Sequence, residues 1–253
     1  MATQTATKLL PVEELYGSWG NAYDQGQVNN MQGLDAVQQE TYLPKFLSLT
    51  HEAHSSQKNL KIVDFGCGTG RTTLKLLNLP SATIVGLDAT PQLIELAREK
   101  SASHLNSLPQ DTRVASVQYE VYNPLIHPQA PECAQNAHGL ISTLALEHFT
   151  LPEFFKAISP LVQPGSYLMV TDLHPDLATL NSYTIVDEKS GELMWTSASH
   201  IHPIDGVRAE APKWGMEVVE VQEASPKDPK MVGAMRGNWE GVKCWVGYLL
   251  KKD

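Results

Sequence analysis

The chain has 253 residues, of which 42% are hydrophobic, and a formal net charge of −9 at pH 7. This length is enough for one α/β domain with a sizeable core. The negative charge argues against a nucleic-acid or anionic-membrane surface, because phosphate binding needs a basic face. No apolar run of about 18 residues or more occurs, so we expect no membrane span.

The three cysteines, at positions 67, 133 and 244, are few, odd in number and without metal-ligand spacing. They predict a reducing compartment, no disulfide framework and no metal site. The N-terminal segment lacks the apolar stretch of a signal peptide, which favours a cytoplasmic location. No repeat or change of composition divides the chain, so we expect a single domain over residues 1–253.

Residues 1–11 are polar and are expected to be disordered, whereas 12–50 are expected to form a helical cap before the first strand. Tyr16, Trp19 and Tyr23 bring three aromatic rings into this cap. They fit either an aromatic face against the core or a lid over a cationic ligand, since aromatic faces attract cations. The second helix of this cap, before the first strand, is indicated by the apolar residues Leu34, Val37, Tyr42, Leu43, Phe46 and Leu47.

A glycine-rich turn follows the first predicted strand, and the rest of the chain is organised around it. The β-branched strand over 60–64 ends in Asp64, and Gly66, Gly68 and Gly70 then occupy alternate positions before a helical segment. Glycine reaches positive φ and lets a ligand approach the backbone closely. This pattern is typical of the nucleotide-binding start of an open α/β sheet.

A second acid stands at the end of the next strand, which we predict over 83–88. The carboxylate of Asp88 can accept both hydroxyls of a ribose at this place. A dinucleotide fingerprint starting at Gly66 would need a small residue at position 71, where Arg71 stands, so an NAD-dependent enzyme is disfavoured. A purely structural βα turn is the alternative to a cofactor site.

The following segments continue the alternation of strands and helices. Thr90–Pro91 is typical of a helix start, Thr150–Glu153 fits a capping box, and Pro164–Gly165 is expected to end a helix. Further strands are predicted over 113–121, 138–143, 167–172, 217–221 and 242–250.

Residues 173–201 are longer than a plain connection between strand and helix. They contain a predicted hairpin of 184–187 with 192–196. An insertion here lies near the carboxyl ends of the strands, where ligands bind in such sheets. We therefore expect 173–201 to be a substrate-side insertion.

The D-x-G-x-G-x-G run that begins at Asp64, together with Asp88, resembles motif I and the ribose acid of the class I S-adenosylmethionine (SAM) dependent methyltransferases. Five strands separated by helices, followed by two strands joined directly, resemble the Rossmann-like seven-stranded α/β sheet of that family, with strand order 3-2-1-4-5-7-6. The segments 146–148, 171–175 and 241–245 are similar to fungal-type secondary-metabolite methyltransferases.

The resemblance implies SAM as the cofactor. In the family arrangement, the backbone N–H groups of 66–70 would face its methionine part, and Asp64 would bind its ammonium or brace the loop. Asp88 would bind the ribose, and Leu144 would lie under the sulfonium. Tyr16, Trp19 and Tyr23 match a segment that covers the cofactor in many members.

At the adenine end, the resemblance implies that Tyr122 and Asn123 border the base. Family members often have an acid at this place, which accepts from the adenine amino group. Asn123 stands there instead, and its side-chain carbonyl can still accept.

A hydroxyl or ammonium acceptor would need a general base that titrates near neutrality. His148 and His174 are the candidates, and Asp172 could orient one of them. Packing or strand-end roles are the structural alternatives for these residues, and His200 and His202 are weaker candidates. A thiolate or free amine acceptor would need no base.

The resemblance thus implies a SAM-dependent methyltransferase that acts on an O or N atom of a small molecule, in secondary metabolism. A SAM-binding protein that catalyses a non-methylating step such as cyclisation is one alternative, and a protein methyltransferase is another. No nucleic-acid or membrane partner is expected, and the chain would act as a monomer or homodimer.

Overall fold

The computed structural model describes residues 8–10, 13, 14, 16, 31–180, 185–186, 193–196, 200–226 and 241–253. Within these residues, no helix is both long and apolar enough to cross a bilayer. Cys67, Cys133 and Cys244 carry unpaired thiols.

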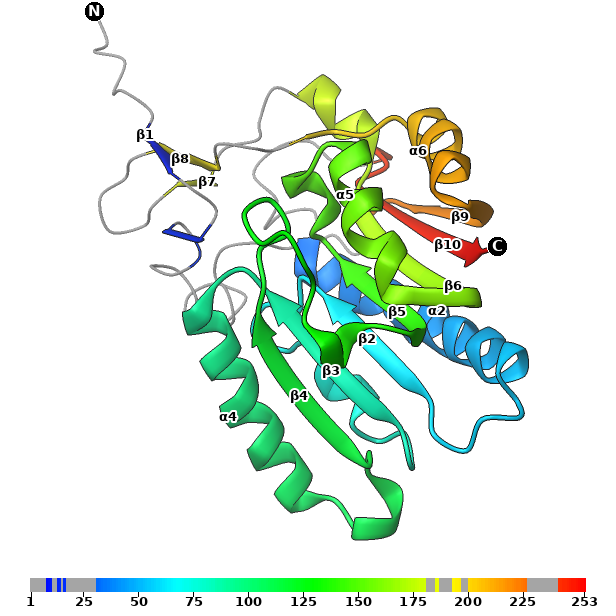
Figure 1. Cartoon of the computed structure of the whole chain (residues 1–253). Coiled ribbons are helices and arrows are strands. Elements are labelled where there is room, and N and C mark those ends of the chain that lie inside the picture. The colour runs from blue at the N-terminus through cyan, green and yellow to red at the C-terminus, as the bar shows by residue number, and fades with distance from the viewer. Residues whose placement is uncertain are drawn as a thin grey trace, which may run out of the picture.

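A seven-stranded sheet forms the centre of the molecule (Figure 1). Its first five strands are parallel, and β10 runs antiparallel to both of its neighbours, β6 and β9. This order confirms the predicted 3-2-1-4-5-7-6 arrangement. From one edge to the other, the strands are β4 (Ser116–Val121), β3 (Thr83–Asp88), β2 (Lys61–Phe65), β5 (Ala137–Thr143), β6 (Val162–Leu173), β10 (Trp245–Lys252) and β9 (Met216–Ala224).

Helices cover both faces of this sheet, which explains why its inner strands are apolar on both sides. Val63, Ile84 and Ile141 in β2, β3 and β5 have no exposed surface. Figure 1 shows α5 in front of the sheet and α2 behind it. The helices are α2 (Met31–Ala53), α3 (Thr73–Leu76), α4 (Pro91–Ser107), α5 (Leu151–Ile158) and α6 (Ile204–Glu210).

The helix α2 presents a partly polar face to the sheet. The second predicted cap helix is confirmed. Val37 on this helix is 47% exposed, whereas Asp35 and Gln39 are buried. Buried hydrogen-bond partners hold these two polar side chains inside.

The N-terminal segment joins a second, small sheet. In it, β1 (Lys8–Leu10) runs parallel to β8 (Leu193–Thr196), which pairs antiparallel with β7 (Ile185–Val186). The hairpin prediction is thus confirmed, whereas the expectation of disorder is wrong for 8–10. A strand of three residues carries no sequence signal of its own, because its order comes from hydrogen bonds to β8.

The predicted start of α5 is confirmed, whereas its predicted end is wrong. Thr150 and Glu153 form the predicted capping contact at the start of α5, with Glu153 Oε2 accepting from the Thr150 N–H at 2.8 Å. Pro164–Gly165 does not end that helix. It lies inside β6, which begins at Val162, and Gly165 takes a φ of +83° there.

Candidate cofactor and catalytic site

The glycine loop after β2 and the acid at the end of β3 form one hydrogen-bonded unit. The φ angles of Gly66, Gly68 and Gly70 are +75°, +54° and +83°. The Gly68 N–H donates to Oδ2 of Asp88 over 2.8 Å, and the Thr90 N–H donates to Oδ1 over 2.8 Å. The Thr90 side chain is a third hydrogen-bond partner of this carboxylate. Part of the acceptor capacity of its two oxygens remains, so the half-buried Asp88 can still accept from a ribose.

The other amides of this loop are used inside the protein. The N–H groups of Gly66 and Cys67 donate to the Leu87 carbonyl at 2.8 and 2.9 Å, and the Gly70 N–H donates to the Cys67 carbonyl at 2.9 Å. The expectation that the loop amides face the methionine part of a cofactor is wrong for these groups and for Gly68. A tight turn between buried strands must satisfy its own donors, so the glycines provide room rather than hydrogen bonds.

Asp64 lies beneath the loop with no exposed surface. The Thr73 hydroxyl donates to its Oδ2 over 2.5 Å, whereas Oδ1 has no hydrogen-bond partner. Burial raises the pKa of Asp64 to about 7, and the Thr73 hydrogen bond and the Arg71 charge oppose this rise. Of the two predicted roles, the contact with Thr73 at the start of α3 supports the brace.

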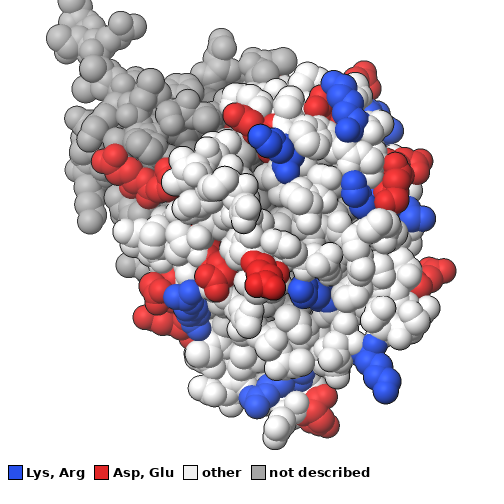
Figure 2. Space-filling view, viewed as in Figure 1, with Lys and Arg blue, Asp and Glu red and all other residues white. Residues whose placement is uncertain are grey.

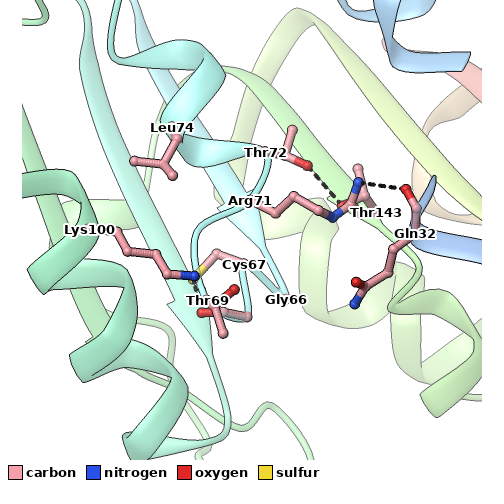
Figure 3. A pocket seen from close by; sticks show the side chains of 10 residues that line it. Gln32, Gly66, Cys67, Thr69, Arg71, Thr72, Leu74, Lys100 and Thr143 are labelled. Carbon is pink, nitrogen blue, oxygen red and sulfur yellow. Dashed lines mark hydrogen bonds between the residues drawn. The ribbon is translucent and has the colours of Figure 1, made fainter. Parts of the chain in front are cut away.

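A cavity of about 210 Å³ lies beside the loop. Figure 3 shows Arg71 with Gln32 and Thr143 at one end and Lys100 near Thr69 at the other. Among the described residues that line it, Arg71 and Lys100 are cationic and none is a carboxylate. The electrostatics of this cavity therefore favour an anionic group.

Leu144 follows β5 in an unusual backbone conformation. Its φ of +53° is rare for a residue with a side chain. Its N–H donates to the Thr171 carbonyl at 2.9 Å, which holds the turn against β6. Residues held in such conformations cluster at ligand sites, in keeping with the prediction that Leu144 lies next to a cofactor.

The loop after β4 holds the two residues predicted at the adenine end. The buried Tyr122 ring stacks on His127, with centroids 5.9 Å apart. The Asn123 Oδ1 accepts from the Leu125 N–H at 2.9 Å, and its Nδ2 donates to Glu13. Oδ1 therefore already serves its own loop, and only its second acceptor position is left for an adenine amino group.

The described part of the N-terminal segment contacts two separate loops of this edge. Glu13 contacts Asn123 after β4, and the Tyr16 hydroxyl lies 3.3 Å from Nε2 of His148 after β5. These contacts support the lid interpretation for Tyr16, while Trp19 and Tyr23 lie outside the described residues. Glu13 was not identified from the sequence, because nothing in its local pattern distinguishes it.

The two candidate bases differ in how their ring nitrogens are used. His148 is half-buried at the end of the turn Leu146–His148. His174 is 3% exposed, and its Nδ1 accepts from the Asp176 N–H at 3.1 Å. Its Nε2 therefore carries the proton and donates to Glu223 Oε1 at 2.7 Å. Both ring nitrogens of His174 are thus engaged within the protein, which argues against its assignment as a general base.

Asp172 does not orient His174, since Glu223 and the Asp176 N–H occupy both ring nitrogens. It is 1% exposed, and its Oδ1 has no partner. Burial, followed by the charge of Glu147, raises the pKa of Asp172 well above its usual range. The predicted orienting role is therefore wrong for His174, and for His148 it stays a prediction.

His200 and His202, the weaker histidine candidates, lie together near the turn Leu146–His148. The rings of His200 and His202 stack with centroids 5.8 Å apart, and the buried His202 Nε2 lies 2.9 Å from the Phe149 carbonyl. Among the residues that the structure covers, no three His, Cys, Asp or Glu side chains lie close enough together to hold a metal ion.

Asp35 is a buried residue that the sequence did not identify. Its carboxylate has no exposed surface and accepts four hydrogen bonds. The donors are Arg71 at 2.6 Å, Gln39 at 2.7 Å, Thr171 at 2.8 Å and Trp245 at 2.9 Å. Most of these donors are far from Asp35 in the sequence, so no local pattern could have revealed this cluster.

These residues fit the cofactor that the resemblance implies. No atom lies within 4 Å of the point where a Cβ on Gly68 would stand, which leaves room over the loop. Asp88 offers acceptor positions for a ribose, and the cavity beside the loop offers a cationic wall for the carboxylate of an amino acid.

Comparison with known proteins points the same way. Residues 56–224 match a family model described as a methyltransferase domain. The chain is 32% identical to an uncharacterised methyltransferase of Emericella nidulans, across 92% of this chain and 88% of that protein.

Two solved structures share the fold at low sequence identity. The [4+2]-cyclase SpnF is 13% identical, with a TM-score of 0.63 and coverage of 98% of this chain and 99% of the cyclase. The magnesium protoporphyrin IX methyltransferase of Synechocystis PCC 6803, with bound S-adenosylhomocysteine, is 16% identical. Its TM-score is 0.61, with coverage of 96% of this chain and 98% of that enzyme.

Proposed function

Since the chain belongs to the class I SAM-dependent methyltransferase family, we propose that it methylates an oxygen or nitrogen atom of a small molecule, in secondary metabolism. One observation carries the cofactor part of this proposal. Asp88 is hydrogen-bonded to Gly68 beside a cavity, and keeps acceptor positions for a ribose.

The chain's own residues would hold and orient the cofactor. SAM supplies the methyl electrophile, so the protein contributes position and electrostatics. Asp88 binds the ribose, Asp64 braces the loop through Thr73, and Leu144 shapes the wall at the tip of β5.

His148 is the better candidate for the group that accepts a proton from a hydroxyl or ammonium substrate. It stands in the turn after β5, within reach of the same edge of the sheet as Leu144. The Tyr16 hydroxyl at 3.3 Å would position its imidazole. We assign no such role to His174, because both of its nitrogens are engaged within the protein.

The surface supports a small molecule rather than a nucleic acid as the acceptor. Figure 2 shows Lys and Arg interspersed with Asp and Glu on the face in view, without a continuous basic stripe. The net charge of −9 points the same way. The hairpin of β7 and β8, which pairs with β1, would form part of the substrate side.

Methyl transfer from labelled SAM into an extract of the source organism tests the proposal, with the products separated by size. Label in the small-molecule fraction is the expected result, and the labelled compound can then be identified. Label in polypeptide would replace the proposal with a protein acceptor. SAM binding without any labelled product would favour a non-methylating step such as cyclisation.

A further inference from the structure

Arg71, the residue directly after the glycine loop, is fixed at the wall of the cavity. Its Nη2 lies 2.6 Å from Oδ2 of Asp35, and its Nη1 lies 3.4 Å from the Gln32 carbonyl. The Arg71 side chain keeps 27% of its surface exposed, whereas the Asp35 side chain has none. Arg71 thus presents a charged group to the cavity from a buried anchor.

Asp35 cannot itself take a ligand, because its acceptor positions are filled. Oδ1 accepts from Thr171 and Trp245, and Oδ2 accepts from Arg71 and Gln39. A carboxylate offers about four acceptor positions. Asp35 therefore acts on the cavity only by holding the guanidinium of Arg71 in place.

A side-chain donor in this cavity can bind an anion. The amides of Gly66, Cys67, Gly68 and Gly70 already donate to protein oxygens, so these four groups are not available to it. A guanidinium has five N–H donors, and only part of this set is used by Asp35 and the Gln32 carbonyl. Its planar donors match a carboxylate.

We propose that Arg71 binds the carboxylate of the cofactor's amino-acid part and that Asp35 is its positioning residue. This inference rests on the proposed function, because it assumes that SAM occupies the site. It adds to that function the side chain, Arg71, by which the site would distinguish SAM from decarboxylated SAM, which lacks this carboxylate. Lys100 lies at the other end of the cavity, near Thr69 (Figure 3), and is the cation with which the role of Arg71 is compared.

Calorimetric titration with SAM and with decarboxylated SAM tests the inference without any need for a substrate. The two ligands differ in the carboxylate alone. The unmodified chain should bind SAM about tenfold or more tightly than decarboxylated SAM, as expected for a charge-assisted contact. Arg71→Met should bind both ligands alike, with the affinity for decarboxylated SAM changed by less than about twofold. Asp35→Asn should reduce the preference for SAM over decarboxylated SAM without abolishing it.

Lys100→Met is the matched control, because it removes the second cation of the same cavity and should keep the preference for SAM. The inference is overturned if Arg71→Met weakens both ligands equally, or if Lys100→Met abolishes the preference instead. Thermal melting of each variant shows whether the fold is intact. If the unmodified chain binds neither ligand, the proposed function itself fails, and this outcome differs from a failure confined to Arg71.

Discussion

The Asp88 carboxylate accepts the backbone N–H of Gly68 at 2.8 Å, so the acid at the end of β3 holds the glycine loop that follows β2. The residue proposed to bind the ribose is therefore also part of the loop's own structure. Its substitution should change both the cofactor affinity and the local geometry, and the two effects can be separated by experiment.

Asp88→Ala should weaken SAM binding by about 100-fold or more, because charge-assisted hydrogen bonding to the ribose is lost. Asp88→Asn should lose less affinity, since its amide oxygen can still accept the Gly68 or the Thr90 N–H. Calorimetry gives the affinities, and thermal melting gives the effect on the loop. Unchanged SAM affinity in Asp88→Ala would refute the ribose assignment.

Gly66→Ala should destabilise the fold by about 2–4 kcal/mol, from a positive φ and an overpacked contact together. A Cβ at this position would lie 2.6 Å from the Cβ of Ala145. Gly165→Ala is the control, since Gly165 also has a positive φ but open space around it. It should lose only about 1–2 kcal/mol. Urea unfolding gives the free energy of unfolding of both variants. Equal losses of stability would show that the structure accommodates the close contact between the new Cβ and Ala145 without an energetic cost.

His148→Gln should lower kcat by about 100-fold for a hydroxyl substrate, as expected when a general base is removed. SAM affinity should stay unchanged, because the base does not touch the cofactor. His174→Gln is the comparison, and it should lower the melting temperature with little effect on kcat, because His174 joins Glu223 to the end of β6. The reverse pattern would assign the base to His174.

The burial of Asp64 should make stability depend on pH. Its pKa rises from an ordinary 3.8 to about 7 in the folded protein, so the folded state binds the proton more tightly. This contribution to stability is complete below about 3.8 and is lost as the pH rises to about 7, with a total of up to about 4 kcal/mol. Asp64→Asn removes the titration and should gain stability relative to the unmodified chain between pH 5 and 8.

Urea unfolding of the two proteins across this pH range checks the expected gain. All other titrating groups are common to both, so the difference in free energy of unfolding isolates Asp64. Parallel stability curves would mean that Asp64 stays charged in the folded protein.

Local patterns were sufficient for the main architecture. The predicted strand 83–88 coincides with β3, and the strand over 60–64 differs from β2 by one residue at each end. The order of the strands in the sheet was implied by the resemblance to the methyltransferase family, and the structure has that order.

The sequence failed where order or burial depended on a distant partner. Lys8–Leu10 forms a strand only because β8 supplies its hydrogen bonds. Asp35 is buried because Arg71, Thr171 and Trp245, all distant from it in the sequence, donate to its carboxylate.

The sequence by itself determined the first two strands of the sheet, the glycine loop and the two acids at the ends of β2 and β3. The tertiary structure alone decided that His174 has no nitrogen to spare, that the loop amides are already used, and that Arg71 is anchored by Asp35. The physical reason is that periodicity and turn chemistry are local and fix which residue stands at a strand end. The partner of a buried polar group is chosen by whichever segment packs against it, and that segment can come from anywhere in the chain.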